Sequence, residues 1–233
     1  MLNEPLMVAQ DGAANNPWFS WDYVTRNSDD ILNALNQHVT LTWQAMVIAV
    51  LVSLPLALVA RRFSKLSGWI IGLSGVLYTI PSLALFAVLA PFTGIGSVTV
   101  LIGLVAYALL VLVRNILVGL QEVDPAVTDA ARGMGYGPWQ VLLRVEVPNA
   151  LPTIIAGIRL ATVTTVALAT VGVVVGYGGL GQLMFRGLWN DYRAEVVTAT
   201  LLCLALAFIL DFALWIVGKT VTPWTRRATA EAA

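Results

Sequence analysis

The sequence predicts an all-α integral membrane protein, and three observations lead to this fold class. Of the 233 residues, 58% are hydrophobic and only 11% are charged, whereas soluble domains carry charge on roughly 25% of their residues. The apolar residues gather in uninterrupted runs, several of which reach the roughly 20 residues that a membrane-spanning helix needs. A long polar stretch, residues 124–152, separates these runs into two halves. The formal net charge is zero, so we expect no nucleic-acid partner.

Residues 1–38 precede the first apolar run and are predicted to form a tail followed by a short helix at the membrane surface. Ser28 can cap this helix, and two aspartates follow in its first turn. Aromatic residues, which concentrate at the headgroup level of a bilayer, lie just before it. The apolar face of the predicted surface helix would carry Ile31, Leu32 and Leu35.

Five apolar segments are predicted to cross the membrane as helices. Pro81 should kink the second of them, because proline removes an internal hydrogen bond. In the fourth, a stripe of small residues should let a neighbouring helix approach closely; it consists of Gly157, Ala161, Thr165 and Ala169. The five predicted spans are residues 39–60, 66–91, 97–119, 152–175 and 196–218.

The distribution of basic residues orients the spans, because cytoplasmic connections carry an excess of Lys and Arg. Five spans place the two ends of the chain on opposite sides, with the N-terminus outside. Residues 39–218 then form the transmembrane domain, and residues 219–233 a cytoplasmic tail. The basic residues predicted inside are Arg61, Arg62, Lys65, Arg132, Arg144, Lys219, Arg226 and Arg227, against Arg26, Arg186 and Arg193 outside.

The long polar stretch is predicted to form a helix, a turn and a second helix. Asp124 can accept hydrogen bonds from free N–H groups at the helix start, and Pro125 suits the first helical position. Glycines within 133–137 should end the first helix, because glycine tolerates the turn conformations found there. The second helix should span residues 139–147 and end at Pro148.

This stretch resembles the EAA loop of permease subunits of ATP-binding-cassette (ABC) importers. The matching residues are Asp129-Ala130-Ala131, Gly135, Val145 and Val147-Pro148. Asp129 stands where Glu is usual, and Val145 and Val147 stand where Ile and Leu are usual. The resemblance implies the type I ABC importer permease fold, with a cytoplasmic coupling helix that docks on an ATPase subunit. The coupling residues it implies are Asp129, Ala130, Ala131, Arg132, Gly133, Gly135 and Pro148.

Four further segments resemble permeases of the osmoprotectant subfamily, which import glycine betaine, carnitine, choline, proline betaine or related quaternary ammonium compounds. These segments are residues 78–96, 112–125, 158–171 and 176–187. A permease for methionine or another small solute is an alternative, because the GGLG sequence at 178–181 also occurs in such proteins. A secondary transporter, a different class, would be expected to show an inverted repeat and charges near the bilayer midplane. No obvious repeat is present.

The resemblance also implies the partners. Two copies of an ATPase subunit would hydrolyse ATP and bind its Mg, since this chain has no GxxxxGK[ST] loop. A second permease chain, identical or homologous, an extracytoplasmic substrate-binding protein and membrane lipid would complete the assembly. We therefore expect a transport subunit that is not itself an enzyme and holds neither a cofactor nor a metal. Its expected location is the cytoplasmic (inner) membrane of a prokaryote, as a multi-pass protein.

Two groups of residues are candidates for the translocation path. Backbone can depart from a helix where it borders a cavity, which points to Pro81 and to a glycine cluster proposed as a gate. Aromatic faces attract quaternary ammonium groups, although a buried Tyr or Thr more often satisfies a neighbouring group. The candidate path residues are Tyr78, Pro81, Ser82, Tyr107, Thr162 and Thr165, and the gate residues are Gly176, Gly178, Gly179 and Gly181.

Asp211 is the acidic residue deepest within a predicted span. Carboxylates inside a membrane are candidates for function, but Arg159 or Arg114 could pair with this one. We interpret it as part of a structural ion pair, with proton coupling as the alternative. His38 falls at the outer boundary of the first span and is interpreted as an interfacial residue rather than a ligand. The single cysteine, Cys203, is interpreted as a small buried apolar residue.

Overall fold

A backbone that leaves water for lipid must satisfy its N–H and C=O groups within one segment, and this favours helices in long apolar runs. The computed structural model describes residues 16–224, for a few of them the backbone only, and every regular element within this range is a helix. The predicted all-α class is thereby confirmed. Most of the predicted tail before residue 16, and Arg226 and Arg227 near the C-terminus, lie outside the described residues.

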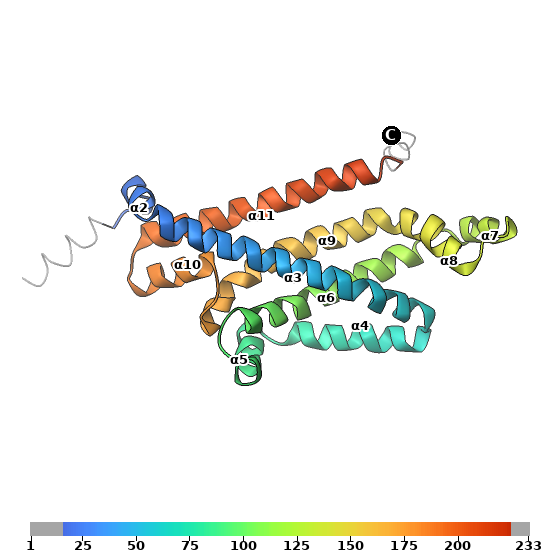
Figure 1. The fold of residues 1–233 in the computed structure, drawn as a ribbon, viewed down its shortest axis with the longest axis horizontal. Coiled ribbons are helices and arrows are strands. Elements are labelled where there is room, and N and C mark those ends of the chain that lie inside the picture. Colours follow the sequence, from blue (N-terminus) through green and yellow to red (C-terminus); the bar gives the residue numbers. More distant parts are fainter. Residues whose placement is uncertain (1–15, 225–233) are drawn as a thin grey trace, which may run out of the picture.

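The helices follow one another in the order shown in Figure 1. Those labelled α3, α6 and α11 run in one direction, whereas α4 and α9 run in the opposite one. The elements are α2 (Trp21–Arg26), α3 (Ser28–Arg62), α4 (Ser64–Thr79), α5 (Ser82–Thr93), α6 (Ser97–Gln121), α7 (Pro125–Gly133), α8 (Pro138–Val141), the π-helical turn η1 (Leu142–Glu146), α9 (Val147–Ala169), the 3₁₀ segment η2 (Thr170–Val175), α10 (Leu180–Trp189) and α11 (Arg193–Val221).

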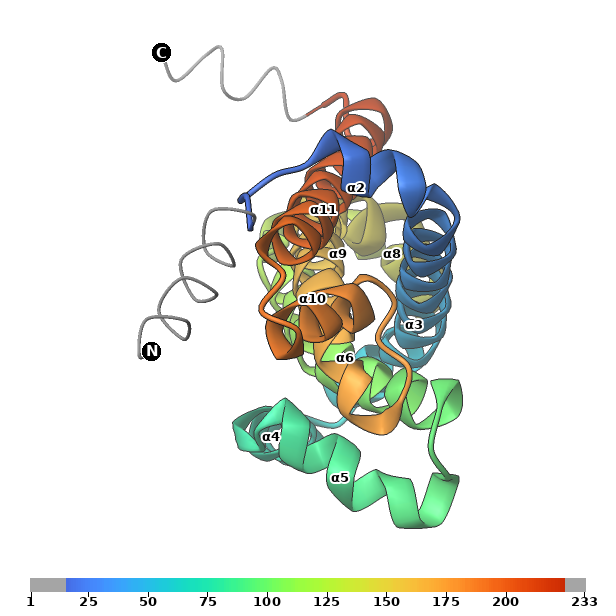
Figure 2. The same cartoon turned by 90° about the vertical axis from the view of Figure 1, so that its left-hand side faces the viewer.

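Four helices of the described chain are long and apolar enough to cross a membrane: Ser28–Arg61, Ser97–Gln121, Pro138–Val175 and Arg193–Val221. They correspond to the first, third, fourth and fifth predicted spans. Viewed end-on in Figure 2, α6 and α9 occupy the middle of the bundle, with α11 and α4 at opposite margins.

The predicted second span is divided in two. Instead of one helix kinked at Pro81, the structure has α4 and α5 separated by Ile80 and Pro81, and α5 runs across the direction of α4 (Figure 2). The kink was therefore the wrong expectation. Proline disfavours the helical conformation of the residue before it, and Pro81 itself is extended, with ψ of 134°. The Tyr107 hydroxyl of α6 donates a hydrogen bond to the Ile80 carbonyl, which the interruption leaves free.

The first span is longer than predicted. Residues 28–38 do not form a separate surface helix, because α3 continues without interruption from Ser28 to Arg62. Its N-cap is Asn27 rather than Ser28, and the short helix α2 precedes it, capped by Ser20. The reason is a buried stripe at helical spacing that crosses the predicted boundary; it consists of Ile31, Ala34, His38, Leu41 and Ala45.

Close packing of α9 against α6 forms the centre of the bundle. The predicted stripe of small residues on α9 is buried in full. At Gly157 the two helices approach so closely that a Cβ atom would overlap the side chain of Asn115 on α6. The stripe therefore allows a neighbouring helix to pack closely against α9, as predicted.

Candidate functional site

The 124–152 loop begins as predicted. The side chain of Asp124 accepts a hydrogen bond of 2.8 Å from the Ala126 N–H, and Pro125 occupies the first turn of α7. Helix α7 ends at Gly133, and Gly135 adopts a φ of 88°, a conformation that favours glycine. The predicted first helix and turn are therefore confirmed.

The second half of the loop differs from the prediction. No helix ends at Pro148; α8, η1 and α9 instead form one continuous helical segment. The π-helical turn accounts for this, because the Val147 N–H bonds to the Leu142 carbonyl five residues earlier. Pro148 lies directly after this turn, inside the continuous segment, so the helix runs past it. Pro152, predicted to begin the fourth span, lies inside the same helix.

One face of α7 is apolar and exposed. Val127, Ala130 and Met134 are exposed and lie on one side of the helix, at spacings of three and four residues. Ala131, by contrast, is only 2% exposed and packs inside the chain. Of the predicted coupling residues, Ala130, Gly133 and Gly135 are at the surface, as are Asp129 and Arg132, which pair at 2.8 Å. The sequence reasoning missed Val127 and Met134, although their spacing from Ala130 could have indicated them.

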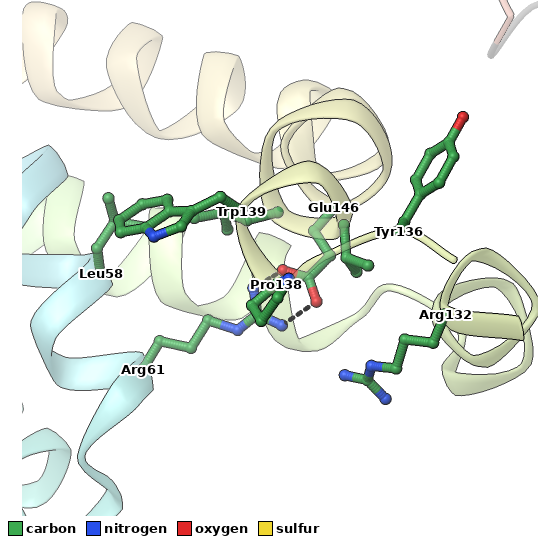
Figure 3. A pocket seen from close by; sticks show the side chains of 9 residues that line it. Leu58, Arg61, Arg132, Tyr136, Pro138, Trp139 and Glu146 are labelled. Carbon is green, nitrogen blue, oxygen red and sulfur yellow. Dashed lines mark hydrogen bonds and ion pairs between the residues drawn. The ribbon is translucent and has the colours of Figure 1, made fainter. Parts of the chain in front are cut away.

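A cavity of about 650 Å³ lies between this loop and the end of α3 (Figure 3). Within it, two N–H groups of Arg61 donate hydrogen bonds to the two carboxylate oxygens of Glu146 in η1. The sequence analysis did not predict this ion pair. A single acidic residue in an otherwise apolar and basic run, LLRVEVP, was the signal that could have found it. The cavity is lined by Leu58, Arg61, Arg132, Tyr136, Pro138, Trp139, Val141, Leu142 and Glu146.

The residues predicted to border the translocation path are not gathered at one surface. Thr162 and Thr165 are buried in α9, where their hydroxyl groups donate to the Ile158 carbonyl and to the sulfur of Met46. Tyr107 is buried and holds the interruption between α4 and α5. Pro81 and Ser82 lie at that interruption. Tyr78 lies in α4, and its side chain is outside the described part of the chain.

Of the four predicted gate residues, three lie in a tight turn between η2 and α10, and Gly181 lies in the first turn of α10. Gly176 and Gly179 have φ values of 75° and 53°. A Cβ atom at Gly178 would lie 2.6 Å from the Val173 nitrogen, and one at Gly181 would overlap the Thr170 carbonyl oxygen. The backbone therefore excludes side chains at these four positions. Whether the turn opens and closes stays a prediction.

His38 holds this turn against the bundle. The imidazole Nδ1 accepts a 3.3 Å hydrogen bond from the Leu180 N–H, and Nε2 lies 3.0 Å from the Val166 carbonyl oxygen. These partners fix the neutral tautomer with its proton on Nε2. The side chain is fully buried, so the expectation of an interfacial histidine was wrong. The turn folds over α3, and the sequence gives no sign of this contact.

Asp211 forms the predicted ion pair with Arg159. The Arg159 Nε and Nη2 atoms lie 2.9 and 2.7 Å from its two carboxylate oxygens. The pair links α9 to α11 at a cavity of about 490 Å³. Among the described residues, no three His, Cys, Asp or Glu side chains gather as a metal site would require.

Comparison with known families assigns this architecture. Residues 49–227 match the family described as the binding-protein-dependent transport system inner membrane component. The chain belongs to this family. It is therefore a permease-type, multi-pass component of the inner membrane, and the resemblance inferred from the 124–152 loop is confirmed.

Curated relatives of this permease cover most of its length. The carnitine transport permease protein OpuCB of Listeria monocytogenes is 35% identical over 90% of this chain and 96% of its own. The choline transport system permease protein OpuBB of Bacillus subtilis is 33% identical over 86% and 93%. The osmoprotectant import permease protein OsmW of Salmonella typhimurium is 34% identical over 86% and 96%. The predicted resemblance to osmoprotectant permeases is thus confirmed.

Solved structures establish the fold of the permease. An inward-facing structure of the MetNI methionine ABC transporter aligns with a TM-score of 0.75 at 22% identity, covering 84% of this chain and 98% of that one. A structure of an amino acid ABC transporter aligns with a TM-score of 0.68 at 19% identity, covering 88% and 98%. The type I importer permease fold is confirmed.

Proposed function

We propose that the chain is the transmembrane subunit of an ATP-driven importer for quaternary ammonium osmoprotectants such as carnitine, choline and glycine betaine. The observation that carries the proposal is the 35% identity over 90% of the chain to a carnitine permease. The likeness to the methionine transporter is one of fold at 22% identity. A methionine permease therefore remains the second candidate within the same class.

The proposed topology has five spans, with the N-terminus outside and the C-terminus in the cytoplasm. The four long apolar helices would provide four of the spans, and α4 together with α5 the remaining one. The alternating helix directions in Figure 1 support this arrangement. The 124–152 loop would then lie in the cytoplasm, and the glycine turn outside.

The 124–152 loop would dock on an ATPase subunit through the exposed face of Val127, Ala130 and Met134. Exposed apolar patches of this kind mark interaction surfaces. The partner ATPase, in two copies, would bind ATP and Mg, and a second permease chain and an external binding protein would complete the importer. This chain would supply no catalytic group.

Uptake of labelled solutes tests the proposed substrate class. We would measure glycine betaine, choline, carnitine and methionine uptake in cells with and without the chain, at high and low osmolarity. Loss of quaternary ammonium uptake with methionine unaffected is the expected result. Loss of methionine uptake alone would establish the second candidate, and uptake without any ATPase partner would point to a secondary transporter.

Enlarging the exposed face of α7 tests the docking surface. Ala130→Trp should abolish co-purification of the ATPase subunit and ATP-dependent uptake, because the indole would hold the two surfaces apart. Ala130 is exposed in a regular helix, so the larger side chain causes no strain within the chain. Leu51→Trp, an exposed position of α3 outside the loop, is the control. Normal ATPase binding by Ala130→Trp would refute this surface.

A further inference from the structure

Glu146 occupies a position in which a carboxylate needs a partner. Its side chain is only 5% exposed, and both of its oxygens are bound by the guanidinium group of Arg61 (Figure 3). A paired, two-point contact of this type fixes geometry as well as charge. Removing either partner would leave the other charge without compensation, which is strongly unfavourable for the buried carboxylate.

Arg61 belongs to α3 and not to the loop. Near it, Ala57 and Ala60 are buried in a core cluster that α3 shares with α6 and α9, including Leu117 and Ile154. The end of α3 is therefore fixed to the bundle by close packing. Its guanidinium group reaches from this fixed point toward the loop.

At the level of α8 and η1, a cavity lies between the loop and α3. The cavity of about 650 Å³ separates them, with Leu58 and Arg61 on the α3 side and the remaining lining residues on α7, α8, η1 and their connections. Helices α7 and α8 pack on each other and on η1. The Arg61–Glu146 pair crosses the cavity and joins its two walls (Figure 3).

The π-helical turn determines where Glu146 points. Such a turn holds an additional residue, which rotates the preceding helix by about 100° relative to the following one. The orientation of α7 and α8 relative to α9 is therefore set in the same turn that carries Glu146. A change in the loop would reach α9 through the backbone, and it would reach the end of α3 through this ion pair as well as through the packing of α3 on α9.

We infer that Arg61 and Glu146 form a positioning link that makes α3 follow the 124–152 loop, so that ATP hydrolysis is converted into solute movement. The inference rests on the proposed function and deepens it. The residues would act through the loop and touch neither ATP nor the solute. Without the link, the ATPase subunit would still move the loop and α9, while the cytoplasmic end of α3 would be held to them by core packing alone and would follow less closely.

The test uses the complete importer in proteoliposomes, with its ATPase and binding protein, and measures solute imported per ATP hydrolysed. The variants are Glu146→Gln, Arg61→Gln and the exchange Arg61→Glu with Glu146→Arg. Asp22→Asn, which breaks an exposed ion pair with Arg26 in α2, is the matched control. Each single variant should lower the ratio about fivefold or more, with the ATPase still bound and active. The exchange should recover part of the loss, and the control should not change the ratio.

Three results would overturn the link. These are an unchanged ratio in both single variants, loss of the ATPase subunit from both, or equal loss in the exchanged variant. A wild-type complex that imports no quaternary ammonium solute with ATP would instead refute the proposed function.

A distance measurement distinguishes failure of the link from failure of the proposed function, because it does not depend on transport. Spin labels are placed at Leu54 of α3 and Gln140 of α8, both exposed. In the wild type, the distance between the two labels should be the same with and without ATP. The distribution should broaden in Glu146→Gln. An equally narrow distribution in the variant would count against the link even if import were impaired.

Discussion

Single glycines decide whether α10 can start directly after the turn that follows η2. At Gly181, a Cβ atom would overlap the backbone carbonyl oxygen of Thr170, and no flexible side chain is available to move away. Gly75 in α4 is different, since a Cβ atom there meets nothing within 4 Å. The same Gly→Ala change should therefore have opposite effects at the two positions.

We expect Gly181→Ala to lower the free energy of unfolding by about 1–3 kcal/mol, the usual cost of overpacking. Gly75→Ala should have no cost or raise stability by up to about 1 kcal/mol, because alanine favours the helix. Thermal unfolding of the purified protein in detergent measures both. Equal melting temperatures for Gly181→Ala and the wild type would contradict this prediction, because they would show that the backbone near Thr170 can shift at little cost.

The sequence predicted the cap at Asp124 and the turn at Gly135, because both depend on local backbone chemistry. It did not predict that the helix continues past Pro148, since this depends on the π-helical turn that precedes it. The burial of His38 was also missed. Its partners, Val166 and Leu180, lie far away in the chain, and a single histidine carries no periodic signal.

Among the helices, α9 and α11 are joined by charge as well as by packing. The side chains of Arg159 and Asp211 are each 32% exposed and lie within two candidate membrane spans. Charged groups in such positions are costly without a partner. The pair should therefore matter more than an ion pair at an aqueous surface.

We predict that Asp211→Asn lowers the free energy of unfolding by about 2–3 kcal/mol, because it leaves the Arg159 charge without its carboxylate. The double change Arg159→Met with Asp211→Leu should cost less than the single one, since it removes both charges. Asp22→Asn, at an exposed pair, should change stability by less than about 1 kcal/mol. Denaturation in detergent compares the three. A double variant less stable than Asp211→Asn would refute this view.

Four long helices could be located from apolar runs alone, but the division of the second predicted span could not. Hydropathy reports burial from water and does not distinguish a kink from an interruption. The division depends on Tyr107 of α6 accommodating the Ile80 carbonyl, a contact between segments. Likewise, the boundary of α3 was misplaced because Ile31, Ala34 and His38 face the interior from a segment whose other residues are mostly polar.

For the whole molecule, the proposed topology predicts which surfaces face the cytoplasm. Replacing Cys203 and introducing single cysteines at Asn190, an exposed residue between α10 and α11, and at Trp139 in α8 gives two reporters. A membrane-impermeant thiol reagent added to intact cells should label Asn190→Cys and not Trp139→Cys. Permeabilised cells should label both. The reverse pattern in intact cells would invert the topology.

The ion pair between α9 and α11 also bears on how the chain is made. Arg159 leaves the ribosome 52 residues before Asp211, so its charge has no carboxylate partner while the later helix is still being synthesised. Helix α11 has a mean hydropathy of 2.5, and 6% of its most apolar window is buried in the chain, so lipid alone can hold it once it is inserted. A nascent chain that stops short of Asp211 retains an uncompensated guanidinium in the membrane.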